Sequence, residues 1–322
     1  MIELSIVVPI YKEEDNIRPF LTRIENVLHS MQVSYEIVFC LDPSPDRTEE
    51  VVMEEINNNP NIRLIVFSRR FGQPTATMAG MLTCTGKNIV VIDVDLQDPP
   101  ELIADMYDKL GKGYEAVYAK RRIRKGETLI KRCISVVGYY LINLLSDLNI
   151  PRNTGDFRIM SRRIVEEIRR LNECHGYLRG LVSHVGFRQT FVEYDRHERT
   201  HGKGHYNRYI GSLKIGLNGL ISFSSRPLQL MSITGAFFAV FSFLIGTFYI
   251  VQKLMGVELP LGLPTTTVLI TFFAGVQLLS LGLMGEYIGR IYDEAKRRPL
   301  YIVDRKQNFP DSPPVTDKLQ SE

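Results

Sequence analysis

Two long stretches near the C-terminal end of the chain contain no charged residue. They run from Pro227 to Gln252 and from Leu259 to Gly285. Folded as a helix, each is long enough to cross the roughly 30 Å hydrocarbon core of a bilayer. A buried helix of a large soluble core is the alternative explanation. The short connection between the stretches predicts a hairpin, whose two flanks would lie on the same side of a membrane.

Basic residues flank this hairpin on both sides. Cytoplasmic flanks of membrane helices are enriched in lysine and arginine, so both flanks and both termini are expected in the cytoplasm. No cleavable signal sequence is expected, because Glu3 and a short strand pattern occupy the position of its apolar segment. The flanking basic residues are Arg226, Lys296, Arg297, Arg298, Arg305 and Lys306.

These features divide the chain of 322 residues into three parts. Residues 1–225 are expected to form a cytoplasmic domain. Residues 226–290 are expected to contain two transmembrane helices, at about 228–252 and 262–286. Residues 291–322 are expected to form a basic cytoplasmic tail, partly disordered because its end is rich in prolines and polar residues.

The overall composition names no partner. A net charge of +3 is too mild to indicate a particular ligand, and no nucleic acid is expected. The cysteines are widely scattered, which fits a reducing compartment rather than a disulfide-rich domain. The six histidines lack zinc-binding spacing. The four cysteines are Cys40, Cys84, Cys133 and Cys174.

Strand and helix patterns alternate through about the first 120 residues. Short apolar runs of strand length are separated by segments with apolar residues at helical spacing, as at Ile17, Phe20 and Ile24. This alternation is typical of an α/β fold with a doubly wound, mostly parallel sheet covered by helices on both faces. The expected strands are Leu4 to Ile10, Tyr35 to Leu41, Ile62 to Phe67, Ile89 to Ile92 and Ala116 to Ala119.

The fourth of these runs leads into the sequence Asp93-Val-Asp-Leu-Gln-Asp-Pro-Pro100. Alternate side chains of an extended chain share a face, so Asp93 and Asp95 are expected to point the same way. Two such carboxylates repel each other unless a cation lies between them. Together with Gln97 they form an oxygen-rich set that suits Mg²⁺ or Mn²⁺. An acidic turn that caps the following helix is the alternative.

Polar residues also follow the other expected strands. Ligands of doubly wound sheets lie at the carboxyl ends of the strands, so these residues are expected to form one site. The sequence has neither the glycine motif of dinucleotide-binding domains nor the phosphate loop of ATPases, which leaves a nucleotide held by a metal through its diphosphate. The residues are Tyr11, Glu13, Asp42, Arg69 to Gly72, Arg121 and Arg122.

Four sequence blocks carry a resemblance to a known family. The chain resembles the family 2 inverting glycosyltransferases of the GT-A fold. It is similar, more closely, to the polyprenyl-phosphate glycosyltransferases, which include the bactoprenol glucosyltransferases and dolichol-phosphate mannose synthases. The likeness covers residues 1 to about 225, and the two apolar stretches resemble those of the bacterial glucosyltransferases. The blocks are Val7-Val-Pro-Ile-Tyr-Lys-Glu13, Leu41-Asp-Pro-Ser-Pro-Asp46, Asp93-Val-Asp-Leu-Gln-Asp-Pro-Pro100 and Gly155-Asp-Phe-Arg-Ile-Met-Ser-Arg162.

The resemblance implies roles for individual residues. Asp95 and Gln97 match the family's metal ligands, and Asp156 matches a residue that serves as catalytic base or orients the acceptor. Asp93 matches a position near the ribose and sugar, so Asp93, Asp95 and Asp156 are expected to form the catalytic set. From the resemblance and the strand ends together, the residues expected to bind the sugar nucleotide are Pro9, Tyr11, Glu13, Asp42, Arg69, Gly72, Asp93 and Arg121.

The acceptor implied by the resemblance is a lipid phosphate, which needs cationic partners. The family's acceptor loop usually reads Arg-x-x-Gly-x-Ser-Lys-Tyr. This chain reads Arg199-Thr-His-Gly-Lys-Gly-His-Tyr206, so Lys203 is the candidate in place of the usual lysine. Two amphipathic segments, Ile130 to Leu148 and Ile210 to Phe223, are expected at the membrane surface, with ordinary core helices as the alternative. The acceptor candidates are Arg122, Arg124, Lys131, Arg199, Lys203 and Tyr206.

The sequence therefore predicts a metal-dependent hexosyltransferase of the bacterial cytoplasmic membrane. The resemblance implies inverting transfer of one hexose, glucose from UDP-glucose in this subgroup, to undecaprenyl or another polyprenyl phosphate. Alternatives are the same chemistry with GDP-mannose or a UDP-linked amino sugar, and a scaffold that binds nucleotide without catalysis. A processive polysaccharide synthase fits less well, because two spans are too few for a polymer channel and the chain has no tryptophan. A homo-oligomer is compatible with the sequence.

Overall fold

The computed structural model describes residues 1–122, 154–171, 173, 178–195, 224–256 and 262–310. These residues fall into two compact units. One unit contains the described residues up to Asp195 together with the segment from Pro299 onward, and the other contains those from Ser224 to Arg298. The first unit is therefore assembled from parts of the chain that lie before and after the second.

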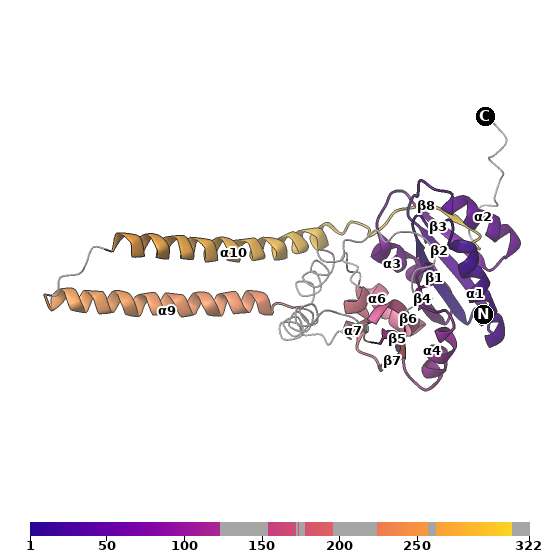
Figure 1. The fold of residues 1–322 in the computed structure, drawn as a ribbon, viewed down its shortest axis with the longest axis horizontal. Coiled ribbons are helices and arrows are strands. Elements are labelled where there is room, and N and C mark those ends of the chain that lie inside the picture. Colours follow the sequence, from indigo (N-terminus) through magenta and orange to yellow (C-terminus); the bar gives the residue numbers. More distant parts are fainter. Residues whose placement is uncertain (123–153, 172, 174–177, 196–223, 257–261, 311–322) are drawn as a thin grey trace, which may run out of the picture. The chain divides into compact units, whose positions relative to one another are not determined.

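The first unit is built on an eight-stranded sheet (Figure 1). Its strands are β1 (Leu4–Ile10), β2 (Tyr35–Leu41), β3 (Ile62–Phe67), β4 (Asn88–Val91), β5 (Ala116–Arg121), β6 (Thr154–Ser161), β7 (Gln189–Tyr194) and β8 (Val303–Gln307). Their order across the sheet is β7-β5-β6-β4-β1-β2-β3-β8. Neighbouring strands are parallel except where β6 meets β4 and β5 and where β8 meets β3. The prediction of an α/β fold with a doubly wound, mostly parallel sheet is confirmed.

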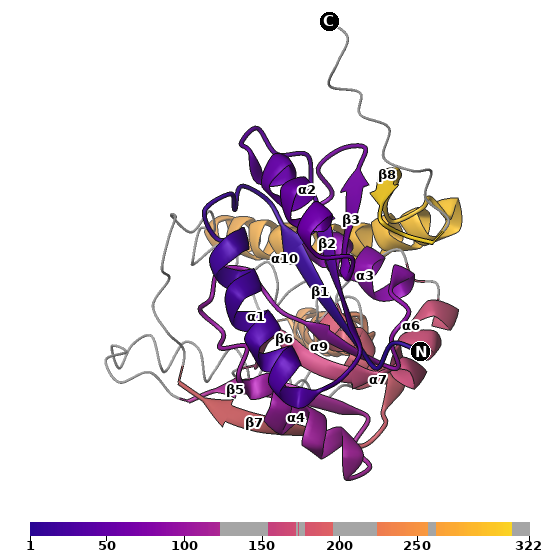
Figure 2. The same ribbon diagram turned by 90° about the vertical axis from the view of Figure 1, so that its right-hand side faces the viewer.

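Helices cover both faces of this sheet (Figure 2). One face carries α1 (Ile17–Met31), α2 (Thr48–Asn58) and α4 (Leu102–Gly111), and the other carries α3 (Gln73–Thr83), α6 (Arg162–Leu171) and α7 (Leu178–Val185). Alternate residues of a strand face opposite sides, so Ile6 of β1 joins the core under α1 whereas Val7 faces α3. A side chain at Gly80 would collide with Val7 and Cys40, so glycine lets α3 pack directly on the sheet.

The eighth strand comes from the segment that was expected to be a partly disordered tail. β8 runs antiparallel to β3 at the edge of the sheet, with Leu64 opposite Gln307 and Phe67 opposite Val303. Three of its five residues are charged, so its hydrophobic pattern gave no indication of a strand. Backbone hydrogen bonds to β3 and the ion pair of Arg305 with Glu49, rather than burial of side chains, hold it in place. Residues 311–322 lie outside the described residues.

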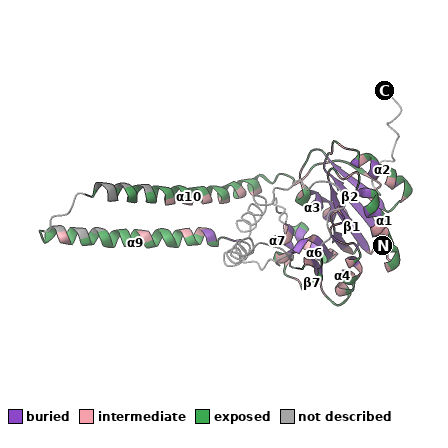
Figure 3. Ribbon diagram, viewed as in Figure 1, coloured by how far each residue is buried: buried purple, intermediate pink, exposed green. Residues whose placement is uncertain are grey.

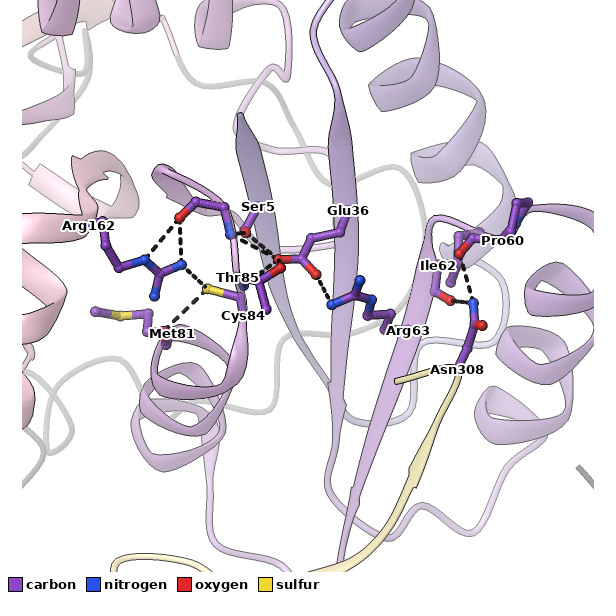
Figure 4. A network of polar contacts seen from close by, with 11 residues as sticks. Ser5, Glu36, Pro60, Ile62, Arg63, Met81, Cys84, Thr85, Arg162 and Asn308 are labelled. Carbon is purple, nitrogen blue, oxygen red and sulfur yellow. Dashed lines mark hydrogen bonds and ion pairs between the residues drawn. The ribbon is translucent and has the colours of Figure 1, made fainter. Parts of the chain in front are cut away.

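A buried ionic network joins the strands at the amino-terminal end of the parallel sheet (Figure 4). One carboxylate oxygen of Glu36 accepts hydrogen bonds from the Ser5 hydroxyl at 2.5 Å and from the backbone N–H groups of Thr85 at 2.5 Å and Gly86 at 3.2 Å. The other oxygen forms an ion pair with Arg63 of β3. The side chain of Glu36 is 1% exposed and that of Arg63 is 12% exposed. This network therefore ties three strands to the connection between α3 and β4.

The second unit contains two long helices, α9 (Arg226–Leu254) and α10 (Leu263–Lys296). Both are long and apolar enough to cross a membrane. Their side chains are mostly exposed, in contrast to the buried strands of the sheet (Figure 3). Phe238 of α9 packs edge-on against two rings of α10, with centroids 6.3 Å from Phe272 and 5.4 Å from Phe273. α10 continues ten residues beyond the predicted end at 286, and the predicted surface segments 130–148 and 210–223 lie outside the described residues.

Candidate active site

The carboxyl ends of β1 to β5 lie along one edge of the sheet. β1 to β4 are parallel, and β5 runs in the same direction because β6 is antiparallel to both β4 and β5. β6 therefore begins at this edge, with Thr154 opposite Lys120, which brings the adjacent Asp156 to the same edge. The predicted site residues on these strands or directly after them are Pro9, Tyr11, Glu13, Asp42, Arg69, Gly72, Asp93, Asp95, Gln97, Arg121, Arg122 and Asp156.

Residues at the end of β1 differ in how far they are exposed. Pro9 lies within the strand and is buried, whereas Tyr11 and Glu13 follow the strand and are partly exposed. The Glu13 carboxylate accepts a hydrogen bond from the Asn16 amide at 2.5 Å, and its backbone N–H donates to the Thr48 hydroxyl at 2.9 Å. Tyr11 and Glu13 are thus partly exposed side chains that follow β1 at this edge of the sheet.

Asp42 organises the loop between β3 and α3. Its carboxylate, at a residue that is only 3% exposed, accepts hydrogen bonds from the backbone N–H groups of Phe71 at 2.9 Å and Gly72 at 2.8 Å. Gly72 has a φ of +90°, a conformation that other residues rarely adopt, so the turn into α3 requires glycine. Asp42 therefore shapes the loop from 68 to 72, and its direct contact with a nucleotide stays a prediction.

Two arginines of this loop stack on aromatic rings. The Arg70 guanidinium lies 4.0 Å from the centroid of the Tyr11 ring, and that of Arg69 lies 4.3 Å from the Phe71 ring. Both arginines are exposed. Cation–π contacts thus hold two positive charges at the edge of the sheet, where they suit an anionic ligand such as a diphosphate. Arg69 was predicted by name as a ligand of the nucleotide, and Arg70 only as part of the range from Arg69 to Gly72 expected at the site.

The chain after β4 forms a turn, so the prediction of an extended conformation there was wrong. Leu96 has a φ of +56°, and the Asp95 carboxylate accepts the backbone N–H of Gln97 at 3.1 Å. This local hydrogen bond is typical of turns that begin with aspartate. Burial nevertheless alternates along the turn, so Asp93, Asp95 and Gln97 are partly exposed while the residues between them are buried. All three polar side chains therefore reach solvent, and their joint approach to one cation stays a prediction.

The oxygen atoms of this turn fit a hard divalent cation. Asp93 is oriented by the Gln73 side chain, whose Nε2 donates to it at 2.7 Å. A nucleotide-bound Mg²⁺ takes one or two carboxylates from the protein and its other ligands from phosphates and water. Within the described residues, no group of three His, Cys, Asp or Glu side chains could hold a metal, and such a group is not required here. Asp95 and Gln97 remain the predicted ligands.

A buried hydrogen-bonded group lies beside the turn. The Tyr194 hydroxyl at the end of β7 donates to Asp98, which is 1% exposed. The Nε of Arg121 donates to the Tyr194 oxygen at 3.1 Å, and its Nη2 lies 3.4 Å from Asp98. Burial, and then the adjacent Asp98 carboxylate, raises the pKa of Tyr194, which therefore stays protonated and donates. No role was predicted for Asp98 or Tyr194, which together position Arg121.

Asp156 lies between two arginines. One of its carboxylate oxygens is 3.0 Å from Nε of Arg179 on α7 and 3.2 Å from Nη2 of Arg158, whose side chain is fully buried. Burial alone would raise the pKa of Asp156, but Arg179 and Arg158 outweigh burial and hold this pKa below its ordinary value. A carboxylate with a lowered pKa is a weak proton acceptor. The arrangement therefore favours an orienting role for Asp156, and Arg179 is a site residue that was not predicted from the sequence.

The predicted acceptor-binding residues are represented by Arg122 alone in the described part of the chain. Its Nη1 lies 3.3 Å from Asp195, and both side chains are exposed. The other predicted acceptor residues, which lie outside the described residues, are Arg124, Lys131, Arg199, Lys203 and Tyr206. The acceptor side of the site therefore stays a prediction.

Comparison with known proteins identifies the family. The model of glycosyl transferase family 2 matches residues 5–169. The chain is 45% identical over 304 residues to an uncharacterized glycosyltransferase of Bacillus subtilis, and the match covers 94% of each protein. It is 38% identical over 305 residues to the bactoprenol glucosyl transferase of Shigella phage SfV, covering 95% of this chain and 99% of that protein. Among solved structures, glucosyl-3-phosphoglycerate synthase of Mycobacterium tuberculosis matches 70% of this chain and 78% of its own, with 18% identity and a TM-score of 0.48. The chain belongs to glycosyl transferase family 2.

Proposed function

We propose that this glycosyltransferase moves glucose from UDP-glucose to the phosphate of a polyprenyl phosphate at the cytoplasmic face of a bacterial membrane. The observation that carries the proposal is the edge of the sheet, where the partly exposed oxygens of Asp93, Asp95 and Gln97 accompany the exposed arginines of the loop after β3. Such a pairing suits a diphosphate held through a metal. The bactoprenol glucosyl transferase that resembles this chain over 95% of its length supports both the sugar and the lipid.

The position of β8 supports the proposed membrane topology. Strands that precede α9 and the strand that follows α10 belong to one sheet. If both helices span a bilayer, the chain must return to the side from which it entered. The basic residues on both flanks of the hairpin favour the cytoplasm for that side. We propose accordingly that residues 1–225 and the segment after α10 are cytoplasmic, and that 226–290 contain the two membrane spans.

Asp95 and Gln97 would hold Mg²⁺ or Mn²⁺ in this proposal. The cation supplies positive charge beside the diphosphate, which offsets the charge that develops on the departing UDP. The Gln73 side chain fixes the orientation of Asp93 beside the diphosphate in this proposal. Arg69 and Arg70, in the loop between β3 and α3, would also bind the diphosphate.

Transfer forms a bond between an acceptor phosphate oxygen and the anomeric carbon, and breaks the bond from that carbon to UDP with inversion. A phosphate monoester has a second pKa near 6 and is mostly dianionic at neutral pH, so no proton needs to be removed from it. Asp156 then acts by keeping Arg179 and Arg158 in place for the acceptor. Its lowered pKa supports this role over that of a general base.

The proposal is tested by a donor panel. The purified full-length protein, in detergent with Mg²⁺ and undecaprenyl phosphate, is incubated with labelled UDP-glucose, a UDP-linked amino sugar or GDP-mannose. The expected result is one labelled lipid, from UDP-glucose, carrying a single hexose. A product from one of the other donors would replace glucose in the proposal. A folded protein that binds UDP and labels no lipid from any donor would contradict sugar transfer to polyprenyl phosphate.

Asp156→Asn tests the orienting role through the pH dependence of the rate. Because the pKa of Asp156 is lowered, its carboxylate is ionised above the unfolded pKa of about 3.9. The contribution of this carboxylate to stability is complete in that range. The charge and the stability are lost only as the pH falls through the lower pKa of the folded protein. The wild-type rate should therefore increase with pH around pH 6, and this increase should come from ionisation of the acceptor phosphate alone. We expect Asp156→Asn to lower kcat/KM between about tenfold and a hundredfold and to keep that rise.

The measurement is kcat/KM from pH 5 to pH 9, where Asp156 does not titrate. Asp105→Asn, which changes an exposed carboxylate on α4, is the control and should leave the profile unchanged. A profile that becomes flat near pH 6 in Asp156→Asn would identify Asp156 as the base instead.

A further inference from the structure

The segment that follows α10 is hydrogen-bonded to the loop after β3. The backbone N–H of Ser68, the first residue after β3, donates to the carbonyl oxygen of Ile302 at 3.0 Å. The pairing of β3 with β8 shifts register between Val66 and Phe67, next to this point. Such irregularities change the direction of a strand. The returning segment thus contacts the chain where β3 gives way to the loop that Asp42 organises.

A row of aromatic rings continues this contact into the loop. The ring of Tyr301 meets the ring of Phe67 edge-on, with centroids 5.9 Å apart, and Phe67 meets Phe71 in the same manner at 6.0 Å. Phe71 in turn donates its backbone N–H to Asp42. Edge-on aromatic pairs stabilise beyond the area that they bury. Tyr301 therefore lies at the outer end of a packed row that leads to the Asp42 carboxylate.

Tyr301 also contacts the helix that starts at the loop. Burial raises the pKa of Tyr301, and a contact of its hydroxyl with Thr83, the last residue of α3, opposes the rise. The first residue of α3, Gln73, is the one that orients Asp93. The loop from 68 to 72 connects β3 to α3, so Tyr301 contacts both of the elements that flank the loop.

The far end of the returning segment is attached independently of the loop. The Asn308 amide donates to the carbonyl oxygens of Pro60 at 2.9 Å and Ile62 at 2.7 Å, at the opposite end of β3. Arg305 forms an ion pair with Glu49 of α2. These contacts allow the effect of Tyr301 to be separated from attachment of the segment as a whole.

We infer that Tyr301 is a positioning residue for the donor: it holds the loop from 68 to 72 in the conformation that binds the nucleotide. The inference rests on the proposed function for the identity of that nucleotide as UDP. Ser68, Arg69 and Arg70 are exposed, so apart from the stacking of Arg70 on Tyr11 the loop depends on its two ends for order. A loop that is ordered before binding loses little conformational entropy when the ligand binds. Loss of Tyr301 should therefore weaken donor binding and leave the chemical step and the acceptor unaffected.

The test compares three variants of the full-length protein. Tyr301→Ala should raise the donor KM, and the dissociation constant for UDP with Mg²⁺ measured by calorimetry, about tenfold. Its acceptor KM, and its kcat at saturating donor, should stay within about twofold of wild type. Tyr301→Phe keeps the ring and should restore donor binding. Asn308→Ala loosens the far end of the segment and should leave both donor constants unchanged.

Several outcomes would overturn the inference. One is that Tyr301→Ala binds UDP as tightly as wild type, and another is that kcat and both KM values change together. A third is that Asn308→Ala weakens UDP binding as much as Tyr301→Ala does. If Tyr301→Ala fails to fold, Tyr301→Leu, which keeps apolar volume without a ring, must show the tenfold weaker UDP binding for the inference to stand. Wild-type protein that binds no UDP would instead contradict the donor in the proposed function, since calorimetry does not depend on sugar transfer.

Discussion

Replacing Asp95 by asparagine should lower the rate of sugar transfer about a hundredfold to a thousandfold, the scale on which loss of transition-state charge stabilisation acts. The substitution keeps the shape of the side chain and an oxygen that can accept the Gln97 N–H, so the turn after β4 should persist. In the proposed site it removes the carboxylate charge that Asp95 would supply to the divalent cation, while that of Asp93 remains in the same turn. The departing UDP would then develop its charge without a cation held beside it.

The rate is measured as kcat with UDP-glucose, undecaprenyl phosphate and Mg²⁺. UDP-dependent binding of Mn²⁺, followed by electron paramagnetic resonance, should be lost in the same variant. Asp108→Asn, an exposed carboxylate of α4, is the matched control and should retain both properties. If Asp95→Asn binds Mn²⁺ with UDP as wild type does, or keeps more than about a tenth of the activity, Asp95 is not the metal ligand.

Replacing Glu36 by glutamine should destabilise the first unit by about 3 kcal/mol, because it leaves Arg63 without its partner charge in a nearly buried position. The amide oxygen can still accept the hydrogen bonds from Ser5, Thr85 and Gly86, but the amide cannot neutralise the guanidinium. The site lies at the opposite end of the strands, so donor KM should not change in the protein that remains folded. The expected fall in the thermal unfolding midpoint is roughly 6 to 12 °C.

Two further variants separate burial from charge. Glu54→Gln removes one of the two carboxylate partners of Arg18, which keeps Glu55, in an ion pair whose side chains are 51% and 59% exposed. Exposed pairs contribute at most about 1 kcal/mol, so this control should barely change the midpoint. The double variant Glu36→Gln/Arg63→Met removes the buried charge as well and should recover much of the loss. A midpoint in Glu36→Gln equal to that of Glu54→Gln would mean that the network of Figure 4 does not stabilise the fold.

The sequence predicted the part of the fold that depends on local hydrophobic pattern. The first three strands begin and end at the predicted residues, because each is an apolar run buried on both faces. β6, β7 and β8 were not predicted as strands. β6 contains Arg158, which is fully buried, and β8 is mostly charged, so neither has the pattern of a core strand. Their pairing is decided by contacts between distant residues, which no short window of sequence contains.

The candidate site divides in the same way. Tyr11, Asp42 and Asp95 were predictable as neighbours, because each follows an apolar strand pattern and ligands lie at the carboxyl ends of parallel strands. Asp156 was predicted only from the resemblance to a known family. It precedes a buried stretch of an antiparallel strand, and the sequence of that strand lacks the hydrophobic pattern of a core strand. Arg179 and Tyr194 had no signal at all, since each becomes part of the site only through long-range hydrogen bonds.

Because β8 is the last strand of the sheet along the chain, the sheet can be completed only late in synthesis. Arg305 pairs with a residue 256 positions earlier in the chain, and both long apolar helices are made in between. At a synthesis rate of about 5 to 20 residues per second, this interval lasts roughly 10 to 50 s, during which β3 has no neighbour on its outer side. An unpaired strand edge is a template for association with other chains. A nascent chain that stalls before the last strand is made, or a fragment cut at that point, therefore leaves exposed the edge of β3 that β8 covers in the finished protein.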